Sequence, residues 1–295
     1  MSSTDRPRFS VVIPAYNEAN YIGATLASLA RQDFPGAVEV IVVDNNCTDD
    51  TAEIARAHGA RVVAEPRSGV CHARQTGTEH SLGEIIVSTD ADTTFHESWL
   101  SRIDLAFSEH PRFVAVAGPC SFADAPWWGR IYPTLLFSAV AVIALLTGRV
   151  FYVTATNISF RRAAWDGYDT RLTQGGDELD LLRRLRRRGK VAFLRDNPTS
   201  TSARRLQRGL FYNVFVSLFY YYFLAYLMNR ISRRKLMRTA PAFRTERTTI
   251  PLLSRIRVGA AVSGLFLVAS MLATPLGREL VPALESMFDG LLRLY

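Results

Sequence analysis

Two carboxylates follow a short apolar segment in the first third of the chain. Asp90 and Asp92 flank Ala91 directly after residues 84–89, whose apolar side chains are typical of a buried strand. Carboxylates at positions i and i+2 of a non-helical turn can both reach one divalent cation. Mg²⁺ or Mn²⁺ suits such a turn, because phosphate and water supply the ligands that the protein does not. An ordinary acidic turn has the same composition, so the metal hypothesis depends on residues elsewhere.

Three other polar segments carry side chains suited to a nucleotide. Asp44 can accept a hydrogen bond from uracil N3–H or a ribose hydroxyl, the Tyr16 ring can stack on a base, and Arg74 can pair with a diphosphate. As purely structural features, these segments are a strand-end turn, a polar turn before a helix and a solvated arginine. They are VIPAYNE at 12–18, VVDNN at 42–46 and ARQTG at 73–77.

Apolar segments alternate with segments of helical periodicity through the first 90 residues. This alternation predicts an α/β fold with a mostly parallel sheet, in which ligands bind at the carboxyl ends of the strands. We expect Pro14 to end the first strand and Thr48 or Asp49 to cap the second helix. The predicted strands are 9–13, 38–43, 61–64 and 84–89, the helices are 20–31, 49–58 and 70–81, and the polar strand ends are 14–18, 44–46 and 90–92.

In order and spacing, these motifs resemble those of the family-2 glycosyltransferases, which have the GT-A (Rossmann-like) fold. The resemblance extends from residue 9 to about residue 195. It implies a nucleotide-sugar domain with Mg²⁺ or Mn²⁺ at the acidic turn, where Asp92 is the main metal ligand and Asp90 a metal or ribose contact. The same resemblance implies nucleotide-sugar contacts at Tyr16, Glu18, Asp44, Arg74, Asp90 and Ala91.

Two later segments extend the resemblance. The sequence TATNISFR is similar to the family's segment that lines the sugar and acceptor pocket, which makes Asn157 the expected acceptor contact. The sequence GGDELDLLR resembles the motif that supplies the catalytic base, but the order Asp177-Glu178 departs from the family's Glu-Asp. If Asp180 fixes the register, Glu178 is the base, and either carboxylate can act if the loop shifts. Without the other motifs, this pair would be the acidic start of a helix that ends in arginines.

Charge divides the chain into two parts. Residues 1–127 carry nine basic and seventeen acidic side chains, whereas residues 128–295 carry twenty-six and ten. Residues 183–257 alone contain nineteen basic side chains and two acidic ones. Such a basic stretch favours a polyanionic partner, either nucleic acid or an anionic membrane surface.

The three cysteines have no metal-ligand spacing and leave one unpaired, which indicates a reducing compartment.

Three runs without a charged residue favour the membrane over nucleic acid: 131–148, 209–229 and 258–277. A helix of about 20 residues matches a hydrocarbon core of about 30 Å, although buried core helices have similar composition. The first run lies between the acidic turn and the proposed base. It therefore cannot cross the bilayer by itself, and we expect a core helix or a helix at the membrane surface.

The runs predict two regions, a GT-A domain at 1–205 and a helical membrane region at 206–295. No signal peptide is expected at the start, so the catalytic domain should face the cytoplasm from the cytoplasmic membrane. The connection 230–257 is strongly basic, and the positive-inside rule places it in the cytoplasm too. That favours a re-entrant or interfacial 209–229 with a spanning 258–277, and a two-span hairpin is the alternative.

The expected activity is metal-dependent, inverting transfer of a sugar from a UDP- or GDP-sugar to a membrane lipid or polyprenyl-phosphate acceptor. Processive members of the family carry the pattern Gln-x-x-Arg-Trp, but Gln207 is followed by Arg-Gly-Leu-Phe. This difference favours transfer of one sugar per acceptor. A soluble, protein or oligosaccharide acceptor is the main alternative. A catalytically degenerate membrane scaffold is the alternative outside the enzymes, and a nucleic-acid partner is not expected.

Overall fold

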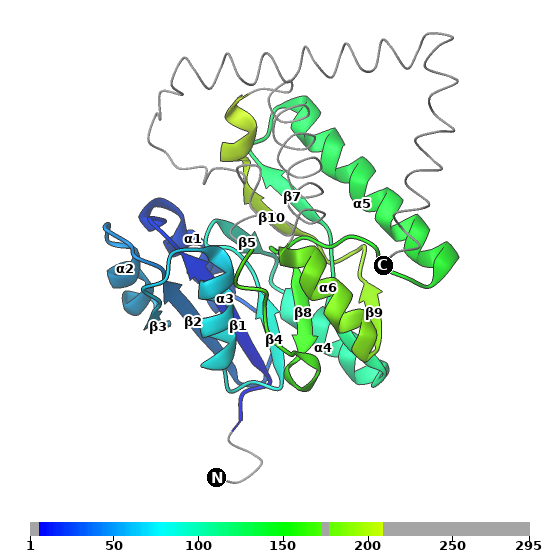
Figure 1. Cartoon of the computed structure of the whole chain (residues 1–295). Coiled ribbons are helices and arrows are strands. Elements are labelled where there is room, and N and C mark those ends of the chain that lie inside the picture. Colours follow the sequence, from blue (N-terminus) through cyan, green and yellow to red (C-terminus); the bar gives the residue numbers. More distant parts are fainter. Residues whose placement is uncertain (1–5, 173–176, 209–295) are drawn as a thin grey trace, which may run out of the picture. The chain divides into compact units, whose positions relative to one another are not determined.

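The computed structural model describes residues 6–172 and 177–208, which belong to one compact unit. The apolar runs 209–229 and 258–277 lie outside these residues. The described part is an α/β structure, as the alternation of apolar segments predicts (Figure 1).

The central sheet has seven strands in the order β3-β2-β1-β4-β8-β6-β9. All neighbours are parallel except β8, which runs antiparallel to both β4 and β6. The sheet is therefore mostly parallel, and β8 is the departure. Its strands are β1 (Phe9–Ala15), β2 (Val38–Asp44), β3 (Arg61–Ala64), β4 (Ile85–Ser88), β6 (Phe113–Ala117), β8 (Ile158–Arg161) and β9 (Lys190–Phe193).

A second sheet of three strands lies beyond the carboxyl end of β4. Its order is β5-β10-β7, with β5 at Thr93–Phe95, β10 at Thr199–Ser202 and β7 at Cys120–Ala123. The last described strand thus returns beside the acidic turn, where the Ser202 N–H donates to the Asp92 carbonyl oxygen at 3.1 Å. This sheet joins distant parts of the chain at the predicted metal motif.

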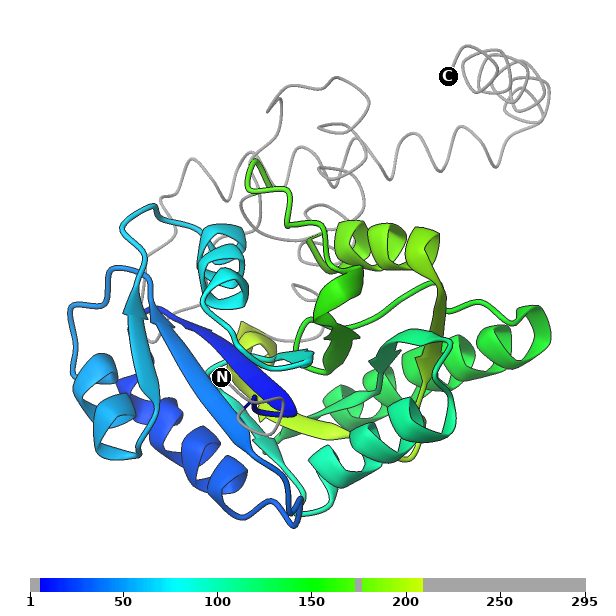
Figure 2. The ribbon, with the colours of Figure 1, turned by 90° about the horizontal axis from the view of Figure 1, so that it is seen from below.

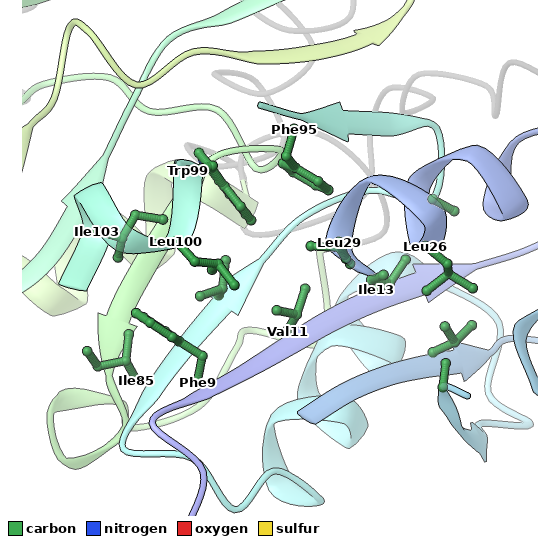
Figure 3. Packing of buried hydrophobic residues seen from close by; sticks show 14 of the residues in the cluster. Phe9, Val11, Ile13, Leu26, Leu29, Ile85, Phe95, Trp99, Leu100 and Ile103 are labelled. Atoms are coloured by element: carbon green, nitrogen blue, oxygen red, sulfur yellow. The ribbon is translucent and has the colours of Figure 1, made fainter. Parts of the chain in front are cut away.

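Helices cover both faces of the large sheet (Figure 2). Successive side chains of each strand point to opposite faces of the sheet. On β1, Phe9, Val11 and Ile13 pack with α1 and α4 (Figure 3), whereas Val12 packs with α3 and α6 residues such as Leu181. The helices are α1 (Ala19–Ala30), α2 (Thr51–Ala57), α3 (Val70–Glu79), α4 (Trp99–Glu109), α5 (Trp127–Thr147) and α6 (Asp177–Arg188), with short 3-10 helices at Arg162–Ala164 and Ala203–Arg208.

All seven predicted elements of the first 90 residues form, with two local differences. Pro14 does not end β1, which continues to Ala15. The pairing of β1 with β4 has already stopped at Val12, so the missing N–H of the proline leaves no β4 partner unpaired. At the second helix, Asp49 lies before Thr51 and accepts a hydrogen bond from its N–H at 3.1 Å, although the helix itself begins at Thr51.

The apolar run 131–148 forms most of α5, which ends at Thr147 and is followed by Gly148 in the left-handed conformation. In the described part of the chain, α5 is the one helix long and apolar enough to cross a membrane. Of its 18 most apolar consecutive residues, 22% are buried. Phe137 on its inner side stacks with Phe193. Most of the apolar side chains of α5 face away from the rest of the described chain, which favours the surface-helix interpretation of this run.

Candidate active site

The loops after β1 and β2 are held together by side-chain hydrogen bonds. Asn17 adopts a left-handed conformation, with φ at 53°, and its Oδ1 accepts from the Thr48 N–H at 2.8 Å. Short amides tolerate this conformation better than most side chains. The Glu18 N–H donates to Oγ1 of Thr51 at 2.8 Å. These contacts fix the backbone on both sides of Glu18, in the segment that directly follows Tyr16.

The end of β2 is fixed in a similar way. Oδ1 of Asp44 accepts from the Cys47 N–H at 2.8 Å, so one carboxylate oxygen shapes the turn. The next residue, Asn45, is buried and donates to the carbonyl oxygens of Glu65 and Arg67 at 2.8 and 2.7 Å. The predicted nucleotide residue Asp44 therefore lies at the end of a parallel strand on a braced loop.

The acidic turn stands between two arginines. Oδ1 of Asp90 lies 2.7 Å from Nη2 of Arg74, and Oδ2 of Asp92 lies 3.0 Å from Nη2 of Arg204. Oδ1 of Asp92 also accepts from Oγ1 of Thr201 at 3.1 Å. The two carboxylates are therefore held by different parts of the chain, with α3 on one side and the segment after β10 on the other.

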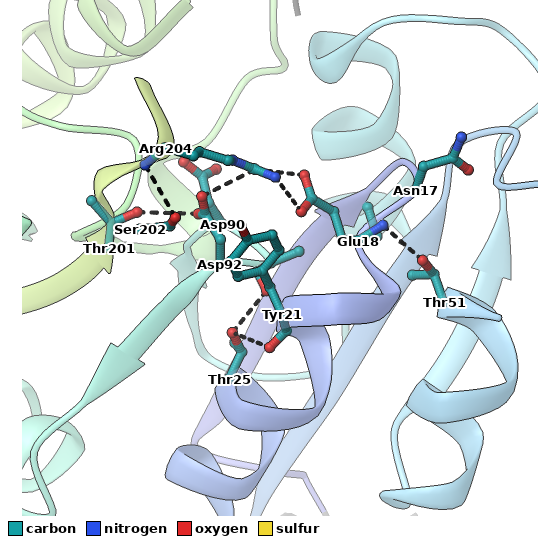
Figure 4. A network of polar contacts seen from close by, with 12 residues as sticks. Asn17, Glu18, Tyr21, Thr25, Thr51, Asp90, Asp92, Thr201, Ser202 and Arg204 are labelled. Atoms are coloured by element: carbon teal, nitrogen blue, oxygen red, sulfur yellow. Dashed lines mark hydrogen bonds and ion pairs between the residues drawn. The ribbon is translucent and has the colours of Figure 1, made fainter. Parts of the chain in front are cut away.

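Arg204 is a site residue that the sequence motifs do not reveal. Its Nη1 and Nη2 donate to the Glu18 carboxylate at 2.7 and 2.6 Å, and its guanidinium lies over the Tyr21 ring at 4.9 Å (Figure 4). In the sequence it is one of many basic residues in the stretch that indicates a polyanionic partner. No local pattern distinguishes it from them.

Arg74, the expected diphosphate contact, forms two ion pairs within the protein. Its buried guanidinium pairs with Asp90 through Nη2 and with Asp177 through Nη1. Burial acts to lower the pKa of Arg74, but the charges of Asp177 and Asp90 overcome it and raise the pKa. Arg74 therefore connects the acidic turn to the first turn of α6.

The acidic pair at the start of α6 has two distinct environments. Asp177 is buried, and although burial acts to raise its pKa, the Arg74 guanidinium holds it below the ordinary value. Glu178 is half-buried, and burial together with the charge of Asp177 raises its pKa well above the ordinary value. A carboxylate with a raised pKa is the stronger base once it has lost its proton, and Asp177 is already paired with Arg74.

Asn157, the expected acceptor contact, makes internal hydrogen bonds in this structure. Its side chain is buried, its Oδ1 accepts from Nε1 of Trp99 at 3.1 Å, and its Nδ2 donates to the carbonyl oxygens of Pro119 and Asn197 at 2.9 and 2.8 Å. All of its polar atoms thus have internal partners. Ala91 is also buried, and its carbonyl oxygen accepts from Oγ1 of Thr25 at 2.8 Å.

The acidic turn fits a divalent cation by its charge and its donor atoms. In the described residues, no three histidine, cysteine or acidic side chains gather as a self-contained metal site. Mg²⁺ does not need one, because one or two carboxylates with substrate phosphates suffice. Four carboxylates share two guanidinium groups here, which leaves excess negative charge for a cation. The carboxylates are Glu18, Asp90, Asp92 and Asp177, and the guanidinium groups are those of Arg74 and Arg204.

This arrangement can be compared with known proteins. A family model described as glycosyl transferase family 2 matches residues 10–168, which is more than half of the chain. The chain belongs to glycosyl transferase family 2. The matched range includes the loops after β1 and β2, α3 and the acidic turn. The α6 carboxylates and Arg204 lie beyond it.

Curated relatives in the family match shorter stretches. Glycosyltransferase AglE of Haloferax volcanii is 39% identical over 109 residues, covering 35% of this chain and 36% of its own. An uncharacterized glycosyltransferase of Mycobacterium tuberculosis is 42% identical over 123 residues, covering 41% and 54%. A 4,4'-diaponeurosporenoate glycosyltransferase of Staphylococcus aureus is 40% identical over 92 residues, covering 29% and 24%. The chain thus matches from about a quarter to about half the length of these relatives.

Solved structures of glycosyltransferases share the fold. Mannosyltransferase PcManGT of Pyrobaculum calidifontis, in complex with GDP-Man and Mn²⁺, has a TM-score of 0.57 at 22% identity, covering 99% of this chain and 82% of its own. S. aureus TarS 1-349 in complex with UDP-GlcNAc has a TM-score of 0.55 at 20% identity, covering 66% and 58%. The expected α/β GT-A-like fold is confirmed.

Proposed function

We propose that this protein transfers one sugar from a nucleotide-diphosphate sugar to a lipid acceptor at a membrane, with inversion at the anomeric carbon. The observation that carries the proposal is an arrangement of two groups of ion pairs at the acidic turn: Arg204 pairs with Glu18 and Asp92, and Arg74 pairs with Asp90 and Asp177. It joins the donor end of the sheet to a carboxylate with the properties of a base. Membership of the family supports sugar transfer as the chemistry.

The donor would bind over the carboxyl ends of β1, β2 and β4. Asp44, at the end of β2, would contact the base or ribose, and Tyr16 directly follows the neighbouring strand β1. The related structures contain UDP-GlcNAc and GDP-Man, so both nucleotides are candidates. We infer UDP- or GDP-sugars as donors, with the diphosphate over the acidic turn.

Asp92, with Asp90, would hold the divalent metal. A bound Mg²⁺ or Mn²⁺ supplies positive charge that offsets the negative charge developing on the departing nucleoside diphosphate. The complexes of PcManGT and of a mycobacterial glucosyl-3-phosphoglycerate synthase contain Mn²⁺, which supports a metal at this turn. Arg204 adds positive charge on the same side, within reach of Asp92.

Glu178 would accept the proton from an acceptor hydroxyl. The acceptor oxygen forms a bond to the anomeric carbon while the bond from that carbon to the diphosphate oxygen breaks, and the proton moves to the Glu178 carboxylate. Asp177 keeps the pKa of Glu178 high, and Arg74 fixes Asp177. When the acceptor is already an anion, such as a phosphate, this proton transfer is not needed.

The outward apolar side of α5 supports a membrane lipid as acceptor. The relative named 4,4'-diaponeurosporenoate glycosyltransferase is consistent with an apolar acceptor. TarS, named as a poly(ribitol-phosphate) transferase and 26% identical over 201 residues, instead favours a polymer, which is the second candidate. We place the protein at the cytoplasmic membrane with its catalytic domain facing the cytoplasm, where nucleotide sugars are available.

A donor and acceptor screen tests the proposal. Purified full chain would be incubated with UDP- and GDP-sugars, Mn²⁺ and either extracted membrane lipids or a poly(ribitol-phosphate) polymer, and products identified by mass. We expect one sugar added per lipid, with no product from Glu178→Gln when the acceptor is a hydroxyl. Exclusive modification of the polymer would contradict the lipid assignment. No product and no donor hydrolysis with any donor would favour the degenerate scaffold.

A further inference from the structure

A hollow of about 510 Å³ lies at the end of α5, away from the acidic turn. Residues that line it come from three segments: the turn after α5, the last half of α6 and the start of β9. Each segment contributes cations. They are Arg149 from the turn, Arg183, Arg186 and Arg187 from α6, and Lys190 from β9.

These cations form no ion pair with a carboxylate in the described part of the chain. Their neighbours Arg184 and Arg188, in contrast, both pair with Asp166. Basic residues at the end of a helix complement its dipole, which accounts for part of the α6 arginines. It does not account for Arg149 and Lys190, which lie outside α6 and face the same hollow. The hollow is therefore suited to an anion.

The helix that leads to the hollow has an outward apolar stripe. Ile131, Leu135, Val142 and Leu146 are 48%, 66%, 54% and 78% exposed and recur at intervals of four or seven residues. This spacing puts them on one side of α5. Leu145, in the last turn, is 84% exposed. A continuous apolar stripe of this kind in a folded domain indicates a binding surface.

The two features lie end to end, because the α5 helix runs directly into the Arg149 turn. Phe151 links them further: it is half-exposed, and the Arg186 guanidinium lies over its ring at 5.0 Å. An apolar stripe that ends in a group of cations matches a lipid bilayer, with acyl chains beside anionic phosphates.

We infer that α5 rests on an anionic bilayer and that the hollow at its end binds phospholipid headgroup phosphates. Arg149, Arg187 and Lys190, which are exposed, would contact the phosphates, and the stripe would contact the acyl chains. This surface orients the catalytic domain on the membrane. The inference and the proposed function both place the protein at a membrane, but the inference does not depend on sugar transfer.

The test uses full chain reconstituted in bilayers of phosphatidylcholine and phosphatidylglycerol. Leu145→Trp places a fluorescent reporter in the last turn of α5, and brominated acyl chains on one lipid at a time quench it on contact. Quenching of the parent chain, with its four native tryptophans, is subtracted. We expect the reporter to be quenched more strongly by brominated phosphatidylglycerol than by brominated phosphatidylcholine.

The charge contribution is tested by Arg187→Gln with Lys190→Gln in the reporter chain. We expect the relative affinity for phosphatidylglycerol to fall roughly 30-fold, since each cation near an anionic surface contributes about 1 kcal/mol. The matched control is Arg31→Gln with Arg61→Gln, which also removes one exposed cation at a helix end and one on an edge strand. Arg61 lies on β3, at the opposite edge of the sheet from β9, and the control should keep the preference.

Three results would overturn the inference, and none of them bears on sugar transfer. Absence of quenching would show that protein, from this chain or a second copy, covers the stripe. Equal quenching by the two lipids, unchanged by the charge variant, would show apolar contact without a phosphate site. Loss of the phosphatidylglycerol preference on adding a single-stranded RNA oligonucleotide would assign the cations to nucleic acid.

Discussion

Nη2 of Arg204 lies 3.0 Å from Oδ2 of Asp92, the carboxylate to which we assign the metal. The same guanidinium is bound by Glu18, so one cation joins the loop after β1 to the acidic turn after β4. A guanidinium and a divalent cation neutralise the same carboxylate charge. A metal bound to Asp92 would therefore compete with Arg204 for the negative charge of this carboxylate.

We expect Arg204→Ala to tighten Mn²⁺ binding to the donor-free protein by roughly tenfold, or about 1.4 kcal/mol. Removing the guanidinium leaves the charges of Glu18 and Asp92 uncompensated, which favours a metal cation. Calorimetric titration with Mn²⁺ measures the change, and Arg31→Ala, an exposed arginine after α1, is the control. Unchanged or weaker Mn²⁺ binding would show that Arg204 does not compete with the metal.

We expect Asp92→Asn to lower metal-dependent turnover of the donor by roughly 10²–10³-fold, the usual loss when one charge-stabilising group is removed from an active site. The amide keeps the shape of the side chain but loses its charge. Release of the nucleoside diphosphate is the measurement. Asp196→Asn, a substitution at a side chain that is 88% exposed, is the matched control. Turnover equal to the wild type would refute the metal assignment.

The raised pKa of Glu178 predicts a pH-dependent effect on stability. The folded protein holds this proton more tightly than the unfolded chain, so the stabilisation is full below the ordinary glutamate pKa of 4.5 and is lost as pH rises through the raised value. Glu178→Gln cannot ionise, so its Tm should increasingly exceed that of the wild type as pH rises above 4.5. Thermal unfolding across pH measures this difference, with the exposed Glu97→Gln as control. A constant difference in Tm would contradict the prediction.

Asp177 should act on turnover through Glu178. Its charge helps to raise the pKa of Glu178, so Asp177→Asn should move the rising limb of the pH–rate profile to lower pH. If Asp177→Asn instead only displaced the Glu178 side chain, the rate would fall equally at every pH. Asp180→Asn, one turn into α6, is the control and should leave the limb in place. With a phosphate acceptor, the limb should be absent in all of these proteins.

Asn157→Ala should destabilise the fold by about 2–4 kcal/mol, because it leaves Trp99 and two carbonyl groups without their buried partner. Denaturant unfolding measures the loss. The KM for the acceptor in the remaining folded protein should be close to the wild-type value. Normal stability combined with a raised KM for the acceptor would restore the acceptor contact expected from the sequence.

Local sequence determined much of the fold and the position of several candidate site residues. The strands and helices of the first 90 residues follow from short apolar periods and turn residues, which act between near neighbours. The polar strand ends then come together because the carboxyl ends of parallel strands share one edge of a sheet. For this reason the sequence alone could predict that Asp44, Asp90 and Asp92 lie at the same edge of the sheet.

Tertiary structure decided the contacts between distant segments. Arg204 is 186 residues from Glu18, and Asp177 is 103 residues from Arg74, so no local spacing relates them. The return of β10 beside the acidic turn brings the first pair together, and the position of α6 brings the second. The sequence predicts Asn157 as an acceptor contact, and only the packing shows that it is buried and bonded to Trp99. An apolar run can be a core helix or a surface helix, and for α5 only the placement of its neighbours distinguishes the two, because burial is a property of the packed chain and not of the residue.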